Sequence, residues 1–525
     1  MKKSFFCLLV FALILAITGC DNSTKPITIT LDYSRPDYDF SIVQETTPEA
    51  GIELSDLSWD TPDGYTFIGW STSKDEDAMI YEPGCVFFAK ESTTLFAKWL
   101  KIDGPIEFRY DFKSHSFVVV GCDYNSKSVN IPKTIEGKKV SEIQSNAFSG
   151  YKNLISITIP DTITKIGEKA FFDCSSLTSI ELPYGVKSIG MEAFSGCSSL
   201  ASITIPDGIV EISREMFKGC SSLTSILIPY GVKAIRNEAF SGCSSLTSVT
   251  IPDSTTSIGD AVFSYCSSLT SIVIPDSVNS IGGGVFYRCS SLKNIKLSTQ
   301  ITSLPYDSRV GYGHGFFENC SGLTSITIPG NITTIGIFAF KECTNLTTVD
   351  INEGVVSIEN GAFWDCSKLS LVTIPESTTS IDGAVFSGCS SLTSINLPST
   401  INPAGGIYSG TGLTSITIPS GINSIERYAF SYCKSLTSVV ISEGVTAIEC
   451  GAFNRCSQLD SISIPKSMET IEESAFDDCE KLTNVDYSST MSDWNRIEGI
   501  DYLTTGCRNL KTITCIDGII DLTKM

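Results

Sequence analysis

Cysteine is the residue type in this chain with the greatest capacity for chemistry. The 525 residues include 20 cysteines, and a thiol can form a disulfide, bind a metal ion or act as a nucleophile. In stacked repeats equivalent side chains lie about 4.8 Å apart, beyond the ~3.5–4.5 Å between the Cβ atoms of a disulfide. We therefore predict unpaired, buried thiols that act as small apolar packing groups. Fourteen cysteines share one column of an internal repeat: Cys174, Cys197, Cys220, Cys243, Cys266, Cys289, Cys320, Cys343, Cys366, Cys389, Cys433, Cys456, Cys479 and Cys507.

Catalysis and metal binding have little support in the sequence. The chain has two histidines, His115 and His314, and no C-x-x-C pair, so we expect no zinc site. It has no nucleophile elbow, phosphate-binding loop, dinucleotide fingerprint or H-E-x-x-H motif. Cys450 is the one odd thiol inside a repeat and is expected to be inert. We predict a protein that is not an enzyme, with no cofactor; a glycan-cleaving enzyme would need paired carboxylates, which the sequence does not show.

The elements that position these residues come from a 23-residue repeat. One copy is CSSLTSIELPYGVKSIGMEAFSG at 174–196. Ser179–Leu182 alternates polar and apolar residues, which predicts a strand that Pro183 ends. Ala193 and Phe194 are expected on a short helical or 3₁₀ turn. A leucine column marks 16 copies: Leu154, Leu177, Leu200, Leu223, Leu246, Leu269, Leu292, Leu323, Leu346, Leu369, Leu392, Leu413, Leu436, Leu459, Leu482 and Leu510.

A fixed period of this length predicts a β-rich solenoid, in which stacked copies bury each other's apolar side chains. The phenylalanine column runs from Phe148 to Phe476 and is expected to be interrupted by Ile407 and Thr504. The cysteine position is expected to be filled by Tyr151 and Gly410 in two copies. The pattern L-x-x-I-x-I-P-x-x-V-x-x-I-G-x-x-A-F-x-x-C resembles the BspA-type leucine-rich repeat over about residues 105–525. The resemblance implies a bacterial or protist surface protein, and several such proteins are implicated in adhesion to host proteins.

The N-terminus resembles a bacterial lipoprotein signal. Residues 1–20 begin with Lys2 and Lys3, continue with an apolar run too short to span a membrane, and end in Gly19-Cys20. In that resemblance Cys20 is lipidated and becomes the mature N-terminus. An ordinary secretory signal with a chance cysteine is the alternative. Residues 21–26 are expected to be a polar tether.

Residues 27–100 lack the repeat and are expected to form a separate small domain. Strands are predicted at 27–31, 64–70 and 94–99, with Trp70 and Trp99 in the core. The phrases GYTFIGW and TTLFAKW resemble the internalin B-repeat, also called the Listeria–Bacteroides repeat, which implies a β-grasp-like fold. Beyond it we predict an N-terminal cap at 104–150, leucine-rich repeats at 151–483, and degenerate repeats with a C-terminal cap at 484–525.

Binding has two candidate surfaces in the repeat. Exposed strand positions carry columns of Ser and Thr, which also simply suit exposed strands. The step from Cys289 to Cys320 is 31 residues instead of 23, and insertions of this kind often lie on the binding face. The candidate contact residues in this insertion are Tyr306, Arg309, Tyr312 and His314, although a neutral insertion explains its length equally well.

Charge and targeting together predict a function class. The net charge of −21 disfavours nucleic acid and anionic membrane surfaces as partners. We predict a monomeric protein of the bacterial cell envelope, lipid-anchored and exposed at the outer membrane or cell surface. Its solenoid would bind a protein or glycan of the host matrix or of another cell. The alternative is a structural spacer of the envelope without a specific ligand.

Overall fold

The structure, a computed structural model, describes residues 25–34, 39–57, 61–76, 78–308, 313–395 and 405–524. The chain divides into two compact units. The first contains the chain up to Gly104 together with Phe108–His115, and the second contains Pro105–Glu107 and Ser116–Met525. Strand β7 (Ile106–Asp111) lies where the chain passes between them. Each unit is described separately below.

The first unit is built on a mixed four-stranded sheet. Its strand order is β2 (Ser41–Thr46), β1 (Ile27–Asp32), β6 (Thr93–Lys101) and β4 (Tyr65–Ser71), and β1 and β6 run parallel. The short strands β3 (Ile52–Glu53) and β5 (Val86–Phe87) form a separate antiparallel pair in the same unit. The strands predicted at 27–31, 64–70 and 94–99 are confirmed. Trp70 is fully buried and Trp99 packs against the same core, as expected, and the indole of Trp70 donates a hydrogen bond to the carbonyl of Ser55.

The second unit is a solenoid of about 16 turns spaced by about 23 residues, which confirms the predicted fold class. Each turn contributes one front strand, which follows the leucine column, and one back strand, which follows the proline. The front strands are β9 (Ser128–Asn130), β12 (Ser156–Thr158), β14 (Ser179–Ile180), β16 (Ser202–Ile203), β18 (Ser225–Leu227), β20 (Ser248–Thr250), β22 (Ser271–Val273), β24 (Asn294–Lys296), β26 (Ser325–Ile328), β28 (Thr348–Ile351), β30 (Leu371–Thr373), β32 (Ser415–Ile418), β34 (Ser438–Ile441), β36 (Ser461–Ile464), β38 (Asn484–Tyr487) and β39 (Thr512–Cys515).

The back strands are mostly two residues long, although the first two of them are longer than any front strand. They are β8 (Ser116–Cys122), β11 (Lys138–Ile143), β13 (Lys165–Ile166), β15 (Ser188–Ile189), β17 (Glu211–Ile212), β19 (Ala234–Ile235), β21 (Ser257–Ile258), β23 (Ser280–Ile281), β25 (Ser303–Leu304), β27 (Thr334–Ile335), β29 (Ser357–Ile358), β31 (Ser380–Ile381), β33 (Ser424–Ile425), β35 (Ala447–Ile448) and β37 (Thr470–Ile471).

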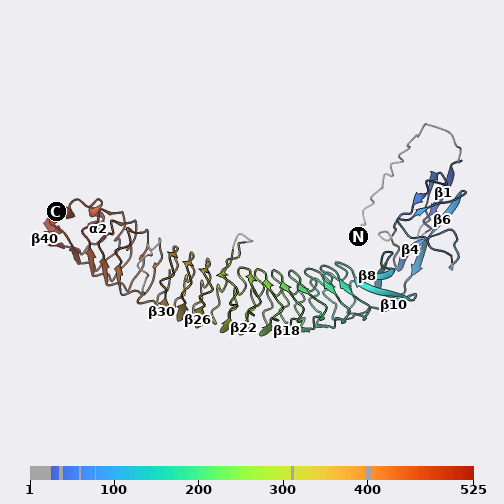
Figure 1. The fold of residues 1–525 in the computed structure, drawn as a ribbon, viewed down its shortest axis with the longest axis horizontal. Helices are drawn as coiled ribbons and strands as arrows, with labels where there is room; N and C mark the ends of the chain where they lie inside the picture. The colour runs from blue at the N-terminus through green and yellow to red at the C-terminus, as the bar shows by residue number, and fades with distance from the viewer. Residues whose placement is uncertain are drawn as a thin grey trace. The chain divides into compact units, whose positions relative to one another are not determined.

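Successive coils pair in parallel with a register of one repeat. Ser179 lies opposite Ser202 and Ile180 opposite Ile203, so each sequence column becomes a row of identical side chains. Figure 1 shows the coils lying side by side through β18, β22, β26 and β30. The core is made of the Leu, Ile, Val, Ala and Phe columns, and the phenylalanine rings stack from coil to coil. The rings of Phe171 and Phe194, for example, have centroids 5.4 Å apart and an angle of 3°.

A segment that we call the turn edge closes each coil between the back strand and the cysteine. The expected helical or 3₁₀ turn around Ala193 and Phe194 is wrong, because two residues per coil adopt the left-handed conformation, here Glu192 (φ 55°) and Gly196 (φ 77°). Alternate turn-edge N–H groups donate to the next coil, and those between them donate to the residue three positions earlier in the same coil. The N–H of Phe171 donates to the carbonyl of Ala193 at 2.8 Å, and equivalent bonds recur along the solenoid.

Non-repeating elements lie at both ends of the repeat array. Near its start, β10 (Thr134–Ile135) and β11 form an antiparallel hairpin whose turn residues, Glu136 (φ 46°) and Gly137 (φ 70°), are both left-handed. Left-handed residues at both positions are typical of a two-residue hairpin turn. At the other end, β39 pairs antiparallel with β40 (Gly518–Asp521). The helices α1 (Met491–Trp494) and α2 (Ile500–Gly506) and the 3₁₀ helix η1 (Leu522–Lys524) complete this region, and Trp494 is buried.

Candidate functional site

The cysteine column is a row of buried thiols with a specific partner. All fourteen column cysteines are buried and free of disulfides, which confirms the prediction. The sulfur atoms also make a backbone contact that the sequence did not predict. Each thiol lies against a backbone carbonyl of the preceding coil: Cys243 Sγ lies 3.2 Å from the carbonyl oxygen of Phe217, and Cys220 Sγ lies 3.2 Å from that of Phe194. Burial raises the pKa of the Cys243 thiol to about 12, so the nucleophilic thiolate is disfavoured.

One coil required a correction to the sequence alignment. Tyr408, not Ile407, occupies the phenylalanine column, because its ring stacks between Phe386 (6.2 Å) and Phe430 (5.2 Å). Thr411, not Gly410, occupies the cysteine column, because its hydroxyl lies 3.3 Å from Cys433 Sγ. The physical reason is that this coil lacks one residue on each side of the turn edge, whereas the alignment placed both losses before it.

The eight-residue insertion was the predicted contact site, and the structure describes part of it. Arg309 and Tyr312 lie outside the described residues. Asp307 and His314 form an antiparallel bridge, with N–H to carbonyl distances of 3.0 and 3.2 Å. The imidazole of His314 stacks on Tyr287 of the preceding turn edge at 3.7 Å and 8°, while Tyr306 meets Phe338 of the following coil edge-on at 6.1 Å. The insertion thus presents Tyr306 and His314 between two aromatic side chains.

A buried acid fixes the base of the insertion. The carboxylate of Glu318, which is 5% exposed, accepts hydrogen bonds from the backbone N–H of Gly315 (3.0 Å) and from Lys341 Nζ (3.1 Å). The oxygen that accepts from Gly315 also lies 3.9 Å from His314 Nδ1. Partial burial lowers the pKa of His314, against the opposing effect of Glu318 and Asp307. The imidazole is therefore neutral at pH 7, and Glu318 and Lys341 form the charged pair of the site.

These residues surround a hollow of about 510 Å³, which we call the insertion pocket. It is lined by Tyr287, Tyr306, Gly313, His314, Glu318, Phe338 and Lys341.

Cationic and aromatic side chains continue along the turn edge on both sides of the insertion pocket. Lys341 Nζ lies 5.1 Å from the ring centre of Phe338 and 5.4 Å from that of Trp364, and Arg288 lies over Tyr265 and Tyr287 at 5.5 and 5.4 Å. Such cation–ring contacts hold long side chains in place at an exposed surface.

Sequence reasoning placed Tyr306 and His314 in the site but missed their neighbours. Glu318 lines the pocket from the insertion's own coil, Phe338 and Lys341 line it from the next coil, and Trp364 adjoins it from the coil after that. The sequence signal that could have identified them is an aromatic residue at an outward-facing turn-edge position. Phe338 stands where most other copies carry Gly, Glu or Ala, and Trp364 stands where many of them carry Ser. Aromatic residues at such positions stand out only once the coils are aligned.

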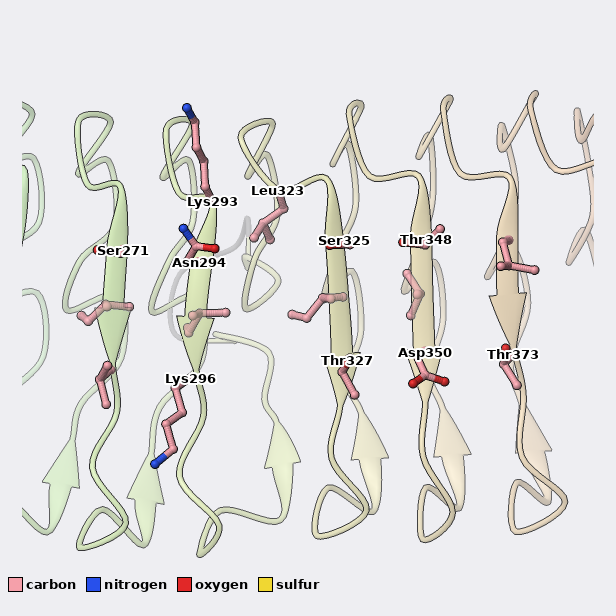
Figure 2. A pocket seen from close by; sticks show the side chains of 16 residues that line it. Ser271, Lys293, Asn294, Lys296, Leu323, Ser325, Thr327, Thr348, Asp350 and Thr373 are labelled. Atoms are coloured by element: carbon pink, nitrogen blue, oxygen red, sulfur yellow. The ribbon is translucent and has the colours of Figure 1, made fainter.

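The front strands carry a second hollow of about 650 Å³, which we call the front groove. Strand β24 ends one front sheet and β26 begins another, although the back strands β25 and β27 pair across the same coils. Figure 2 shows a wider gap between the strand of Asn294 and that of Ser325 than between the neighbouring strands. Small hydroxyl side chains, such as Thr327 and Thr373, line the groove, together with Lys296 and Asp350. The predicted hydroxyl columns are thus exposed on this face.

A second aromatic and cationic site lies farther along the turn edge. Arg455 lies over the ring of Tyr432 at 4.9 Å and hydrogen-bonds its hydroxyl, and Asp478 pairs with Arg455 at 3.4 Å. Tyr432 and Arg455 occupy the same position of consecutive coils, as do Tyr265 and Arg288. This pair therefore offers a matched comparison for the site at the insertion.

The remaining predicted site residue, Cys20, lies outside the described residues. In the part of the chain that the structure describes, no helix is long and apolar enough to cross a membrane. Across the same ranges, no group of three or more His, Cys, Asp or Glu residues is arranged to hold a metal ion.

Parallel 23-residue coils with a leucine column define the chain as a leucine-rich-repeat protein. Family comparison is more specific, because the model of the BspA type leucine-rich repeat region matches residues 120–243, 210–308, 312–433 and 404–524. The chain belongs to this family. Proteins of this kind generally interact with other proteins or act at the cell surface, and their solenoids are typically non-catalytic scaffolds.

A solved structure agrees with this assignment. The chain is similar to a leucine-rich repeat protein from Bacteroides ovatus, with 29% identity over 79% of this chain and 99% of that one and a TM-score of 0.64. It is also similar to a leucine rich cell surface protein from Faecalibacterium prausnitzii, with 31% identity over 75% and 96% of the two chains and a TM-score of 0.42.

One curated relative matches a short stretch only. It is described as a putative Gly-rich membrane protein of Evansella cellulosilytica and is 40% identical over 52 residues. The match covers 10% of this chain and 6% of that protein, so the whole relative's role carries no weight for this chain.

Proposed function

We propose that this protein is a lipid-anchored bacterial surface protein whose solenoid binds a macromolecule of a host or of a neighbouring cell, without catalysis. The partner is a protein or glycan of the extracellular matrix or of a cell surface. Residues 27–100 would act as an internalin B-repeat-like module of β-grasp type between the anchor and the solenoid. The sheet order β2-β1-β6-β4 supports this module, because a hairpin followed by a parallel central pair is the arrangement expected of a β-grasp.

The observation that carries the proposal is the composition of the turn edge at the insertion. Exposed front-strand positions of the repeat carry columns of Ser and Thr, whereas Tyr265, Tyr287, Arg288, Phe338 and Trp364 gather around the insertion pocket. Aromatic residues and arginine dominate the energetics of binding surfaces. A repeat that served only as a spacer would gain nothing from holding these side chains in fixed contacts at one place.

Binding is tested with two forms of the full chain, the natural form and one lacking residues 306–313, which restores the normal repeat length. Both are titrated against matrix proteins, glycans and host cells. Saturable binding that is lost in the shortened form supports the proposal. Binding retained by both forms would place the site on the front strands or in residues 27–100. If neither form binds while circular dichroism shows intact folds, the adhesive proposal fails.

Anchoring is tested separately through Cys20. Acylation supplies about 0.8 kcal/mol per buried CH₂, and two chains are enough for stable membrane attachment. We expect radiolabelled palmitate to be incorporated into the natural chain and not into Cys20→Ala, which should leave the membrane fraction. Protease added to intact cells should cleave the natural chain if the solenoid faces outward. Labelling of Cys20→Ala, or complete protection from protease, would contradict the anchored surface location.

A second candidate function is an envelope spacer without a specific ligand. It is favoured by the regular rows of Ser and Thr hydroxyls, many of which serve the structure itself. The hydroxyl of Thr247, for example, donates to the carbonyl of Thr224 in the preceding coil at 3.1 Å. A spacer would tolerate removal of the insertion with no loss of any binding, so the experiment on residues 306–313 separates the two functions.

A further inference from the structure

The insertion pocket has the dimensions of a small-molecule site. Its volume of about 510 Å³ falls within the roughly 300–1,000 Å³ typical of such sites. Aromatic side chains stand on both sides of it, with Tyr287 under His314 and with Phe338 against Tyr306. These rings come from three consecutive coils whose register is fixed by the parallel ladders, including the pairing of Ser303 with Thr334. The walls of the pocket are therefore held by the solenoid and not by the insertion alone.

Glu318 gives the pocket a fixed hydrogen-bond acceptor. The two oxygens of a carboxylate offer about four acceptor positions. Two donors form hydrogen bonds with Glu318, the N–H of Gly315 at 3.0 Å and Lys341 Nζ at 3.1 Å, and His314 Nδ1 lies 3.9 Å away. Two of these positions are occupied by Gly315 and Lys341, and because Glu318 lines the pocket, a ligand hydroxyl that enters there can donate to a further acceptor position.

The charge of the pocket favours a neutral ligand. Lys341 neutralises Glu318, and burial lowers the pKa of His314 so that its imidazole adds no charge at pH 7. An anion would approach the Glu318 carboxylate, and a cation would compete with Lys341. An apolar anchor from a protein partner would bury the carboxylate without offering it a hydrogen bond, which is unfavourable.

We propose that the insertion pocket binds a neutral saccharide unit of a surface or matrix glycan. The apolar C–H face of the sugar ring lies against the Tyr306 and Phe338 side chains, and a sugar hydroxyl donates to Glu318. Neutral sugars present both kinds of group at once, whereas the pocket has no net charge for an ionic ligand. This inference rests on the proposed adhesive function and names the ligand class for its site.

The test uses the full chain in mild detergent on immobilised oligosaccharides built from neutral hexoses and N-acetylhexosamines. Sialylated and sulfated forms of the same oligosaccharides, and a set of matrix proteins, are included. The best oligosaccharide is then titrated by calorimetry against the natural chain, Tyr306→Ala and Glu318→Gln. Tyr432→Ala is the matched control, because Tyr432 is an exposed turn-edge tyrosine that does not line the insertion pocket. Circular dichroism and thermal unfolding verify that each variant is folded.

We expect saturable binding to a neutral oligosaccharide that weakens at least tenfold in Tyr306→Ala and in Glu318→Gln but not in Tyr432→Ala. The saccharide proposal is overturned if only charged glycans bind, if folded pocket variants bind as tightly as the natural chain, or if no oligosaccharide binds. Binding to a matrix protein that requires residues 306–313, without any saccharide binding, would overturn the saccharide proposal and leave the adhesive function standing. Binding to nothing on either panel would contradict both.

Discussion

Two polar groups buried in the same core have opposite energetic consequences. A column thiol such as that of Cys243 meets the carbonyl of Phe217, which already accepts from the N–H of Cys220 in its own coil. The thiol therefore fills the space of a small apolar group and still has a partner. The hydroxyl of Tyr408 is buried in the aromatic column and has no hydrogen-bond partner among the described residues. An unpartnered buried hydroxyl costs stability.

The column thiols should resist alkylation in the folded protein. Burial raises the pKa of Cys174, Cys243 and Cys343 to about 12, and alkylation requires an accessible thiolate. With iodoacetamide at pH 8, we expect Cys85, which is exposed, to react quickly and Cys450, which is half-buried, to react more slowly. Mass spectrometry of tryptic peptides reads the modification at each site. Rapid labelling of column cysteines in the native chain, at rates seen in urea, would contradict their role as packing groups.

Replacing Tyr408 by phenylalanine should stabilise its coil. The change removes an unpartnered hydroxyl and restores the residue type of the column, with an expected gain of about 1–3 kcal/mol. Hydrogen exchange of peptides within 405–433 measures this gain locally, and exchange should slow. The reverse substitution, Phe386→Tyr, places a hydroxyl in the neighbouring ring position and should speed exchange. Faster exchange in Tyr408→Phe would show that the hydroxyl has a partner, such as a buried water.

His314 should titrate below the usual histidine pKa of about 6.5. Partial burial lowers its pKa, while Glu318 and Asp307 act in the opposite direction. As the pH falls below about 6.5, the unfolded chain takes up this proton before the folded chain does, so His314 makes stability decrease in that range. An NMR titration of the imidazole Hε1 signal measures the pKa, and His115→Gln assigns the signal. The pKa should fall further in Glu318→Gln; a rise would contradict the assigned contacts.

At the scale of elements, the sequence predicted what local patterns determine. Alternation at 179–182 predicted the front strand, although β14 ends at Ile180, before Pro183, and the period predicted the parallel register that Ser179 and Ser202 confirm. It did not predict the left-handed turn edge, because residues such as Glu192 and Tyr265 normally avoid that conformation. Hydrogen bonds to the next coil impose it there, and these exist only in the stacked solenoid.

The same limit explains how much of the candidate site was predicted. Tyr306 and His314 were found because an insertion is visible in one copy of the repeat. Lys341 and Phe338 were missed because they reach the pocket from the following coil, and a contact across coils leaves no local pattern. Tyr408 was misplaced by one position because the sequence does not show where a shortened coil loses its residues.

Glycine at the first left-handed position of a turn edge should stabilise the solenoid. Ala384 has φ 57°, a conformation that costs an alanine roughly 1–2 kcal/mol, and the equivalent positions in two nearby coils are already Gly361 and Gly451. Glycine also has a larger conformational entropy in the unfolded chain, which offsets part of this gain. We therefore expect Ala384→Gly to raise the free energy of unfolding by roughly 0.5 kcal/mol. Calorimetry measures the rise in unfolding temperature. Ala193→Gly, in the buried alanine column, is the control and should lower it.

At the scale of the whole solenoid, stability comes from interfaces between neighbouring coils. Ladders and ring stacks link each coil to the next one only, as in the pairs Phe194–Phe217 and Phe217–Phe240. The stability of such an array is approximately a sum over coils and nearest-neighbour interfaces. Removal of one complete coil should therefore leave the remaining interfaces intact, whereas removal of part of a coil should put every later column out of register.

Deletion of residues 220–242, a complete coil, provides the test. Gly219 then precedes Cys243 as it now precedes Cys220, so the columns stay aligned, although Lys218 loses Glu238 and keeps Glu215. At roughly 0.05–0.15 kcal/mol per residue, we expect a loss of about 1–3 kcal/mol in urea unfolding.

Deletion of 220–231, half a coil, is the matched control and should prevent cooperative folding. Because the deleted coil lies outside the insertion pocket, ligand affinity in the whole-coil deletion should equal that of the natural chain. Loss of affinity with an intact fold would mean that the ligand contacts many coils along the solenoid, and the binding surface would then be the extended row of strands instead of one pocket.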